Sequence, residues 1–177
     1  MNSVLWWARR GGSSTTTRRH NVADQKLNKQ LSLLERKHMQ NTIEMLDSLK
    51  QRFGPDVAGI VDNVIAERTR REWAGIARQA RSNTLDDLIS RLWSPEVRSR
   101  GYEFTIERSE RGVMVVCTRC PVHDMARELG STEWVNHLVC KHDRYIVEGF
   151  NPKLSFRHLK SLMEGQDCCQ QLYSEND

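Results

Sequence analysis

The spacing of apolar residues changes at Gly101, and this change constrains the fold more than any other feature of the chain. Before Gly101, apolar residues recur every three or four positions, which is typical of amphipathic helices. After it, Tyr102, Phe104 and Ile106 alternate with polar residues, which indicates a half-buried strand. We therefore expect helices first and a small sheet afterwards, within one α+β domain.

The part before Gly101 predicts three helices, separated by residues that terminate helices. The predicted helices are Asn21–Phe53, which Gly54-Pro55 stops, a second helix capped by Asp56, and a third that starts at Asn83 or Thr84 and ends at Ser94-Pro95. We expect residues 21–98 to form a helical region that packs on the C-terminal part.

Residues 99–177 predict an α+β region. The expected strands are Tyr102–Glu107, Val113–Thr118, Leu154–His158 and Cys168–Tyr173, and the expected helices run from Pro121 to Gly130 and from Ser131 or Thr132 to Gly149. The predicted fold is thus N-terminal helices followed by a small, mostly antiparallel sheet with two inserted helices, the helices packing on one face of the sheet.

The net charge of +4 is carried by the first twenty residues, which contain four arginines and no acidic residue. The remaining 23 basic residues are balanced by 23 acidic ones, so no nucleic-acid partner is expected. Residues 1–20 are predicted to be a disordered basic tail. Its charges follow the apolar patch instead of preceding it, which does not fit a secretory signal, and no apolar run is long enough to span a membrane.

Five cysteines lie in the last third of the chain: Cys117, Cys120, Cys140, Cys168 and Cys169. The odd number and the adjacent pair argue against a disulfide framework and favour reduced thiols in a cytoplasmic protein. Cys117 and Cys120 form a C-x-x-C motif, but structural zinc sites usually pair two such motifs. Cys117 also fits a core thiol on its strand, and no thioredoxin topology surrounds the motif.

Three of these thiols are expected to converge at one end of the sheet. Cys120 lies where a strand meets a helix, Cys140 shares a helix face with Asp143, and Cys169 begins the last strand, whose neighbour Cys168 should point the other way. The helix dipole should favour the thiolate of Cys120. The thiols are candidates for nucleophiles or for ligands of a divalent metal ion, and these two roles remain open alternatives.

Other polar residues qualify for acid–base chemistry or for anion binding. His123 lies one turn from Cys120 and is a candidate acid or base. Arg157 and Lys160 flank the strand near Leu154, where a guanidinium can bind a small carboxylate in bidentate fashion.

An ordered set of motifs resembles a known family. The set comprises Cys120-Pro121, Glu128-Leu129-Gly130, Cys140-x-x-Asp143, Asn151-Pro152-Lys153-Leu154 and Leu162-Met163-Glu164-Gly165-Gln166-Asp167-Cys168-Cys169. Over residues 100–174 it resembles the L-2-amino-thiazoline-4-carboxylic acid hydrolase family. The chain departs from the family pattern after Cys169, where Gln170 and Gln171 replace an acidic and an aromatic residue.

The resemblance implies a hydrolase that opens the cyclic amidine 2-amino-Δ2-thiazoline-4-carboxylate to N-carbamoyl-L-cysteine, in L-cysteine formation. The expected catalytic residues are Cys120, Cys140, Asp143, Cys169 and His123, and the expected substrate-binding residues are Arg157, Asp167 and Lys160. The matching motifs contain Cys120, Cys140, Asp143, Asp167 and Cys169, whereas the other three are chosen for their chemistry. A non-enzymatic module that senses a small molecule or a metal is the alternative. The expected partner is a small molecule, and the apolar surface of Leu27–Phe53 is also compatible with a homo-oligomer.

Overall fold

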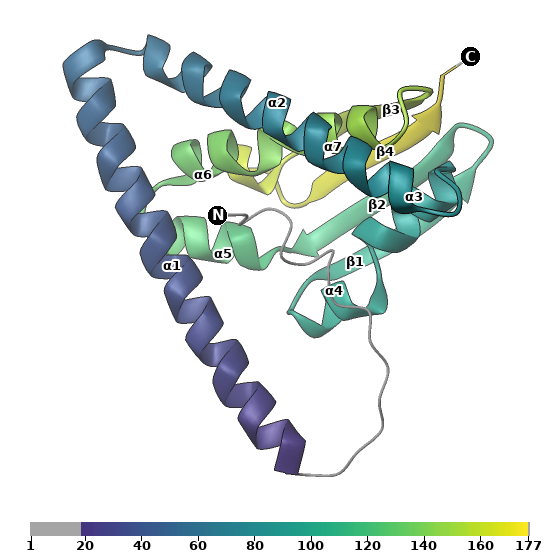
Figure 1. Ribbon diagram of the computed structural model, residues 1–177, viewed down its shortest axis with the longest axis horizontal. Helices are drawn as coiled ribbons and strands as arrows, with labels where there is room; N and C mark the ends of the chain where they lie inside the picture. The colour runs from purple at the N-terminus through teal and green to yellow at the C-terminus, as the bar shows by residue number, and fades with distance from the viewer. Residues whose placement is uncertain (1–18, 177) are drawn as a thin grey trace.

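The computed structural model describes residues 19–176 (Figure 1). Its helices are α1 (Arg19–Phe53), α2 (Asp56–Gln79), α3 (Leu85–Leu92), α4 (Pro95–Ser99), α5 (Pro121–Glu128), α6 (Thr132–Leu138) and α7 (Asp143–Phe150), with 3-10 turns η2 (Cys140–His142) and η3 (Leu162–Glu164). Its strands are β1 (Glu103–Ser109), β2 (Gly112–Arg119), β3 (Leu154–Lys160) and β4 (Cys169–Glu175). The predicted fold class, helices followed by an α+β part, is confirmed.

The four described strands form one antiparallel sheet in the order β1-β2-β4-β3. Alternate residues of β2, such as Val113 and Val115, are buried, because successive side chains on a strand point to opposite faces. The buried face is the one that the helices cover, and α7 packs against both β3 and α2 (Figure 1).

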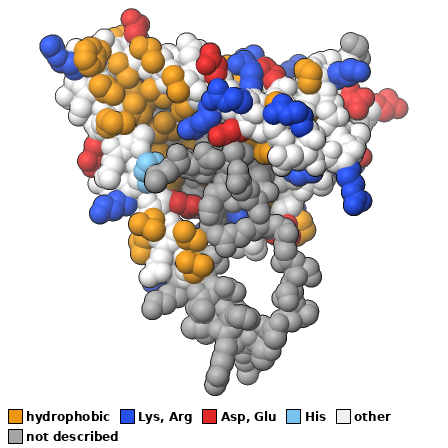
Figure 2. All heavy atoms as spheres, in the orientation of Figure 1, with side chains coloured by type: hydrophobic (Ala, Val, Ile, Leu, Met, Phe, Trp, Pro, Cys, Tyr) orange, Lys and Arg blue, Asp and Glu red, His pale blue; other side chains and the backbone are white. Residues whose placement is uncertain are grey.

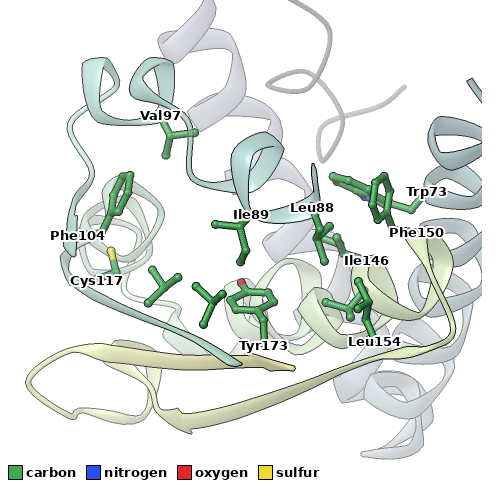
Figure 3. Packing of buried hydrophobic residues seen from close by; sticks show 13 residues of the cluster. Trp73, Leu88, Ile89, Val97, Phe104, Cys117, Ile146, Phe150, Leu154 and Tyr173 are labelled. Carbon is green, nitrogen blue, oxygen red and sulfur yellow. The ribbon is translucent and has the colours of Figure 1, made fainter. Parts of the chain in front are cut away.

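A core fills the space between the sheet and these helices (Figure 3). Trp73 of α2, Leu88 of α3, Phe150 of α7 and Tyr173 of β4 are among its fully buried members. Burying side chains of this size contributes roughly 1.5–3 kcal/mol each. A second core joins α1 and α2 to α5 and α6 through residues that include Ile43 and Trp134. The N-terminal helices therefore hold the segments that carry Cys120 and Cys140.

The helix boundaries follow the sequence with three differences. α1 begins at Arg19, two residues inside the predicted tail, whose other residues lie outside the described part. Asp56 is the first residue of α2 rather than its cap, and Pro55 at the cap position makes no side-chain bond. Pro95 starts the unpredicted helix α4, because proline is well tolerated in a first helical turn. Thr84 caps α3 as expected, through a capping box with Asp87.

The single helix predicted from Ser131 or Thr132 to Gly149 is wrong, because the backbone leaves the helical conformation at Val139. His142 turns inward, and its Nε2 donates to the carbonyl oxygen of His137. In a continuous helix that carbonyl would accept from the N–H of Lys141 instead. The break makes Asp143 the first residue of a new helix that enters the core.

Gly149 marks the closest approach of α7 to α2. A Cβ at this position would lie 2.6 Å from the backbone oxygen of Arg70 and 3.0 Å from Cβ of Trp73. Gly149→Ala is therefore expected to lower the free energy of unfolding by about 1–3 kcal/mol in urea denaturation. Gly59→Ala, at an open position of α2, is the control and should raise it by up to about 1 kcal/mol. Equal effects of the two substitutions would contradict this packing.

Large apolar side chains remain exposed where α1 meets α2, among them Met45, Phe53, Ile60 and Val64 (Figure 2). The predicted homo-oligomer stays a prediction. Within residues 19–176, the helices are too short or too polar to cross a membrane.

Candidate active site

Asp143 occupies the first position of α7, on the helix-covered side of the sheet. Its Oδ2 accepts a hydrogen bond of 3.0 Å from Nε2 of Gln171 on β4. Burial raises the pKa of Asp143 from 3.8 to about 7, although the hydrogen bond from Gln171 opposes this rise. A carboxyl with this pKa is present in both protonation states near neutral pH, which suits a general acid or base.

Three thiols lie within electrostatic reach of this carboxyl. Cys120 precedes α5, Cys140 begins η2 and Cys169 begins β4. Burial raises the pKa of all three, and the negative charge of Asp143 raises each of them further. The structure thus brings Cys120, Cys140, Asp143 and Cys169 together at one end of the sheet. Cys168 lies outside this group, within reach of Asp167.

The start of α5 favours the thiolate of Cys120 as expected, but burial of the thiol outweighs this effect. Burial raises the pKa of Cys120 to about 11, although the backbone N–H groups of Val122 and His123 at the start of α5 lower it. The helix terminus therefore acts in the expected direction, but the cost of burying a charge is larger. Burial also raises the pKa of Cys140 well above its ordinary value. These thiols are neutral near pH 7.

A chain of hydrogen bonds holds the Asp143 carboxyl in place. Trp93 Nε1 donates to the Tyr173 hydroxyl at 3.2 Å, and that hydroxyl donates to Oε1 of Gln171 at 2.6 Å. The amide of Gln171 is thereby oriented with its NH2 group toward Asp143. Sequence reasoning treated Gln171 only as a departure from the family pattern. Its position two residues after Cys169, on the same strand face, was the available signal.

Tyr102 is a second residue that sequence reasoning missed, because it reads there as an apolar strand residue. Its phenol is largely buried, and burial raises its pKa well above 10. The charges of Cys120, Cys140 and Asp143 raise this pKa further, so the phenol lies within electrostatic reach of the site. Tyr102 adds a neutral hydroxyl group to the site.

A groove of about 660 Å³ opens beside Cys140. Its lining comes from α6, η2, α7, β3, η3 and the C-terminal end: Asn136, Cys140, Lys141, Arg144, Val147, Glu148, Pro152, Leu154, Ser155, Phe156, His158, Ser161, Glu164 and Asn176. Cys140 lines the groove and is also one of the three cysteines near Asp143. A small molecule in the groove would therefore contact Cys140, whereas Asp143 lies buried behind the lining.

The structure does not bring the other expected site residues to Asp143. Arg157 is exposed and lies between Phe156 and His158, whose side chains face the helices, so it points to the opposite face of the sheet. Lys160 and Asp167 form an exposed ion pair of 3.1 Å with each other. In the described part of the chain, no hydrogen bond or ion pair joins the His123 side chain to Asp143.

A metal site is not formed by the side chains in the described part. Among residues 19–176, no three His, Cys, Asp or Glu residues are arranged to hold a metal ion. The divalent metal on Cys120, Cys140 and Cys169 remains a sequence-based prediction, which metal analysis of the purified protein can test.

Gln171 accepts a hydrogen bond from the Tyr173 hydroxyl and donates one to Asp143, and replacing it with leucine should remove both. The buried Tyr173 hydroxyl would lose its acceptor, so we expect a loss of about 1–3 kcal/mol in the free energy of unfolding. The pKa of Asp143 should rise, because the hydrogen bond that lowers it disappears. A 13C NMR titration of the Asp143 carboxyl measures this shift. Gln170→Leu, on the other face of β4, is the control, and an unchanged pKa in Gln171→Leu would contradict the proposed contact.

The fold and the site define a class of protein before any comparison. It is an α+β domain with a buried carboxyl of raised pKa and a groove of small-molecule size that shares Cys140 with its surroundings. The family model of L-2-amino-thiazoline-4-carboxylic acid hydrolase matches residues 33–173, and the chain belongs to this family. The match includes most of the helical region as well as the part that carries the motifs. Neither the curated proteins nor the solved structures contain a significant match.

Proposed function

We propose that this protein hydrolyses 2-amino-Δ2-thiazoline-4-carboxylate to N-carbamoyl-L-cysteine, with Asp143 as the acid–base residue. Membership of the hydrolase family supports the substrate. The observation that carries the mechanism is the Asp143 carboxyl, whose pKa burial raises to about 7 and which Gln171 orients. Its surroundings are neutral thiols and a groove that admits a small molecule.

The proposed reaction adds water to the amidine carbon of the ring. Asp143, as a carboxylate, accepts a proton from the water as its oxygen bonds to this carbon. The carbon–sulfur bond then breaks with its electron pair moving to sulfur, and the protonated Asp143 returns the proton to sulfur. When the water oxygen adds, the π pair of the C=N bond moves to the ring nitrogen, which takes up the remaining water proton as the C=O bond forms and sulfur leaves. Both nitrogens stay on the carbon, which gives the N-carbamoyl group and a free thiol. A pKa near 7 allows one carboxyl to perform both transfers at neutral pH.

The thiols have a different role in this proposal. A thiolate nucleophile would first require removal of a proton from a buried group, and burial raises the pKa of Cys120 to about 11. We therefore assign water as the nucleophile. In this proposal Cys120, Cys140 and Cys169 are uncharged thiols near Asp143 that do not react. His123 is proposed only as a further acid or base.

The test is a turnover assay on the purified full-length protein with the racemic thiazoline carboxylate. N-carbamoylcysteine and free thiol are followed before and after chelation, and metal content is read on the same sample. Turnover that survives chelation supports the proposal. Turnover that is lost with the metal and returns with it would overturn the metal-free mechanism. Binding without turnover in either sample would favour the sensing module instead.

A further inference from the structure

Two buried polar atoms near the groove have no partner in the described part of the chain. They are the hydroxyl oxygen of Ser161, a residue only 4% exposed, and Nε2 of His158. Both residues line the groove. Leaving a buried polar group without a hydrogen bond costs about 1–3 kcal/mol of stability. Two such groups in the lining of one groove therefore point to a ligand that bonds to them.

Arg144 is the more exposed of the two cations, Lys141 and Arg144, that line the groove. Lys141 is already paired with Asp62 at 3.4 Å, and Glu148 is held by Arg70 at 2.8 Å. Arg144 reaches the same Glu148 at 3.4 Å through its Nε and one terminal nitrogen, and 60% of its side chain is exposed, against 45% for Lys141. Because Arg70 already neutralises Glu148, Arg144 can exchange this exposed pair for an incoming anion at small cost.

The part of the groove lined by Arg144, His158 and Ser161 lies near Asp143, the proposed acid–base residue. Arg144 follows Asp143 in the chain, and His158 on β3 pairs with Gln171 on β4, whose amide holds Asp143. The rings of Phe156 and His158 are 5.9 Å apart, which places His158 on the helix-covered face. A small molecule in the groove would therefore contact both Arg144 and Cys140, the residue of the groove that lies within electrostatic reach of Asp143.

We propose that Arg144, Ser161 and His158 form the subsite for the carboxylate of a small organic acid. The guanidinium forms charge-assisted hydrogen bonds with the carboxylate, and the Ser161 hydroxyl and the Nε2–H of His158 donate to it. The proposal rests on the proposed function for the identity of the acid, and it replaces Arg157 as the carboxylate partner.

The test compares the binding of two product-like ligands by calorimetry, N-carbamoyl-L-cysteine and N-carbamoylcysteamine, which lacks the carboxylate. Arg144→Gln should weaken binding of the first at least tenfold and leave the second unchanged. Arg157→Gln, the same substitution on the opposite face of the sheet, should change neither. Ser161→Ala should weaken the first ligand severalfold without lowering the melting temperature, because the hydroxyl has no hydrogen-bond partner among residues 19–176.

Equal affinities of wild type and Arg144→Gln for the carboxylate ligand would overturn the subsite, as would the absence of binding by wild type. The turnover assay separates this failure from failure of the proposed function. Turnover with an unchanged KM in Arg144→Gln would retain the hydrolase and reject the subsite. Carboxylate-dependent binding without turnover would retain the subsite and reject the reaction.

Discussion

Asp143→Asn is expected to lower kcat for the thiazoline carboxylate by a factor of about 10²–10⁴, the usual contribution of a general acid–base group. The substitution keeps the shape of the side chain, and the asparagine oxygen can still accept the hydrogen bond from Gln171. The folded structure should therefore survive. The loss of rate reports the missing proton transfer rather than a collapsed site.

The pH dependence of this variant supplies the sharper evidence. In the wild type, kcat/KM should rise with pH and level off above about 7, because burial raises the pKa of Asp143 to that value and its carboxylate is the base. The residual kcat/KM of Asp143→Asn should not show this rise with pH. Asp86→Asn, at an exposed ion pair with Arg108, is the control and should keep the wild-type profile. A rise that persists in Asp143→Asn would assign the titration to another group.

The same substitution is expected to stabilise the protein at alkaline pH. The pKa of Asp143 is raised in the folded state, so the folded protein holds the proton more tightly than the unfolded chain. Wild-type stability from this group is therefore full below about pH 4 and falls as pH rises towards 7. A pKa shift of about three units corresponds to a loss of about 4 kcal/mol. Asparagine carries no charge and avoids this loss.

Urea denaturation at pH 5 and pH 8 measures the effect. The free energy of unfolding of Asp143→Asn relative to wild type should be higher at pH 8 than at pH 5, by a few kcal/mol. Asp86→Asn should show no such change between the two pH values. If Asp143→Asn were the less stable protein at pH 8, the carboxylate would have to be better solvated or paired than its position beside Gln171 indicates. If Asp143→Asn is instead the more stable protein at pH 8 and also loses activity, the buried carboxylate lowers the stability of the fold and is needed for the reaction.

The sequence predicted the elements whose signals are local. Gly54-Pro55 ends α1, Thr84 caps α3 and Pro121 opens α5, each through a property of one or two residues. It did not predict the break at Val139, because that break depends on His142 turning inward to the carbonyl oxygen of His137. Such a contact has no periodic signature.

By itself, the sequence determined that helices precede a small antiparallel sheet and supplied the candidates Cys120, Cys140, Asp143 and Cys169. These follow from spacing along the chain and from chemical type. Only the tertiary structure decided their protonation states, because burial depends on which elements pack over a residue. It also decided that Arg157 lies on the far face of the sheet and that Gln171 holds Asp143, since strand pairing and helix packing set the side to which each residue points.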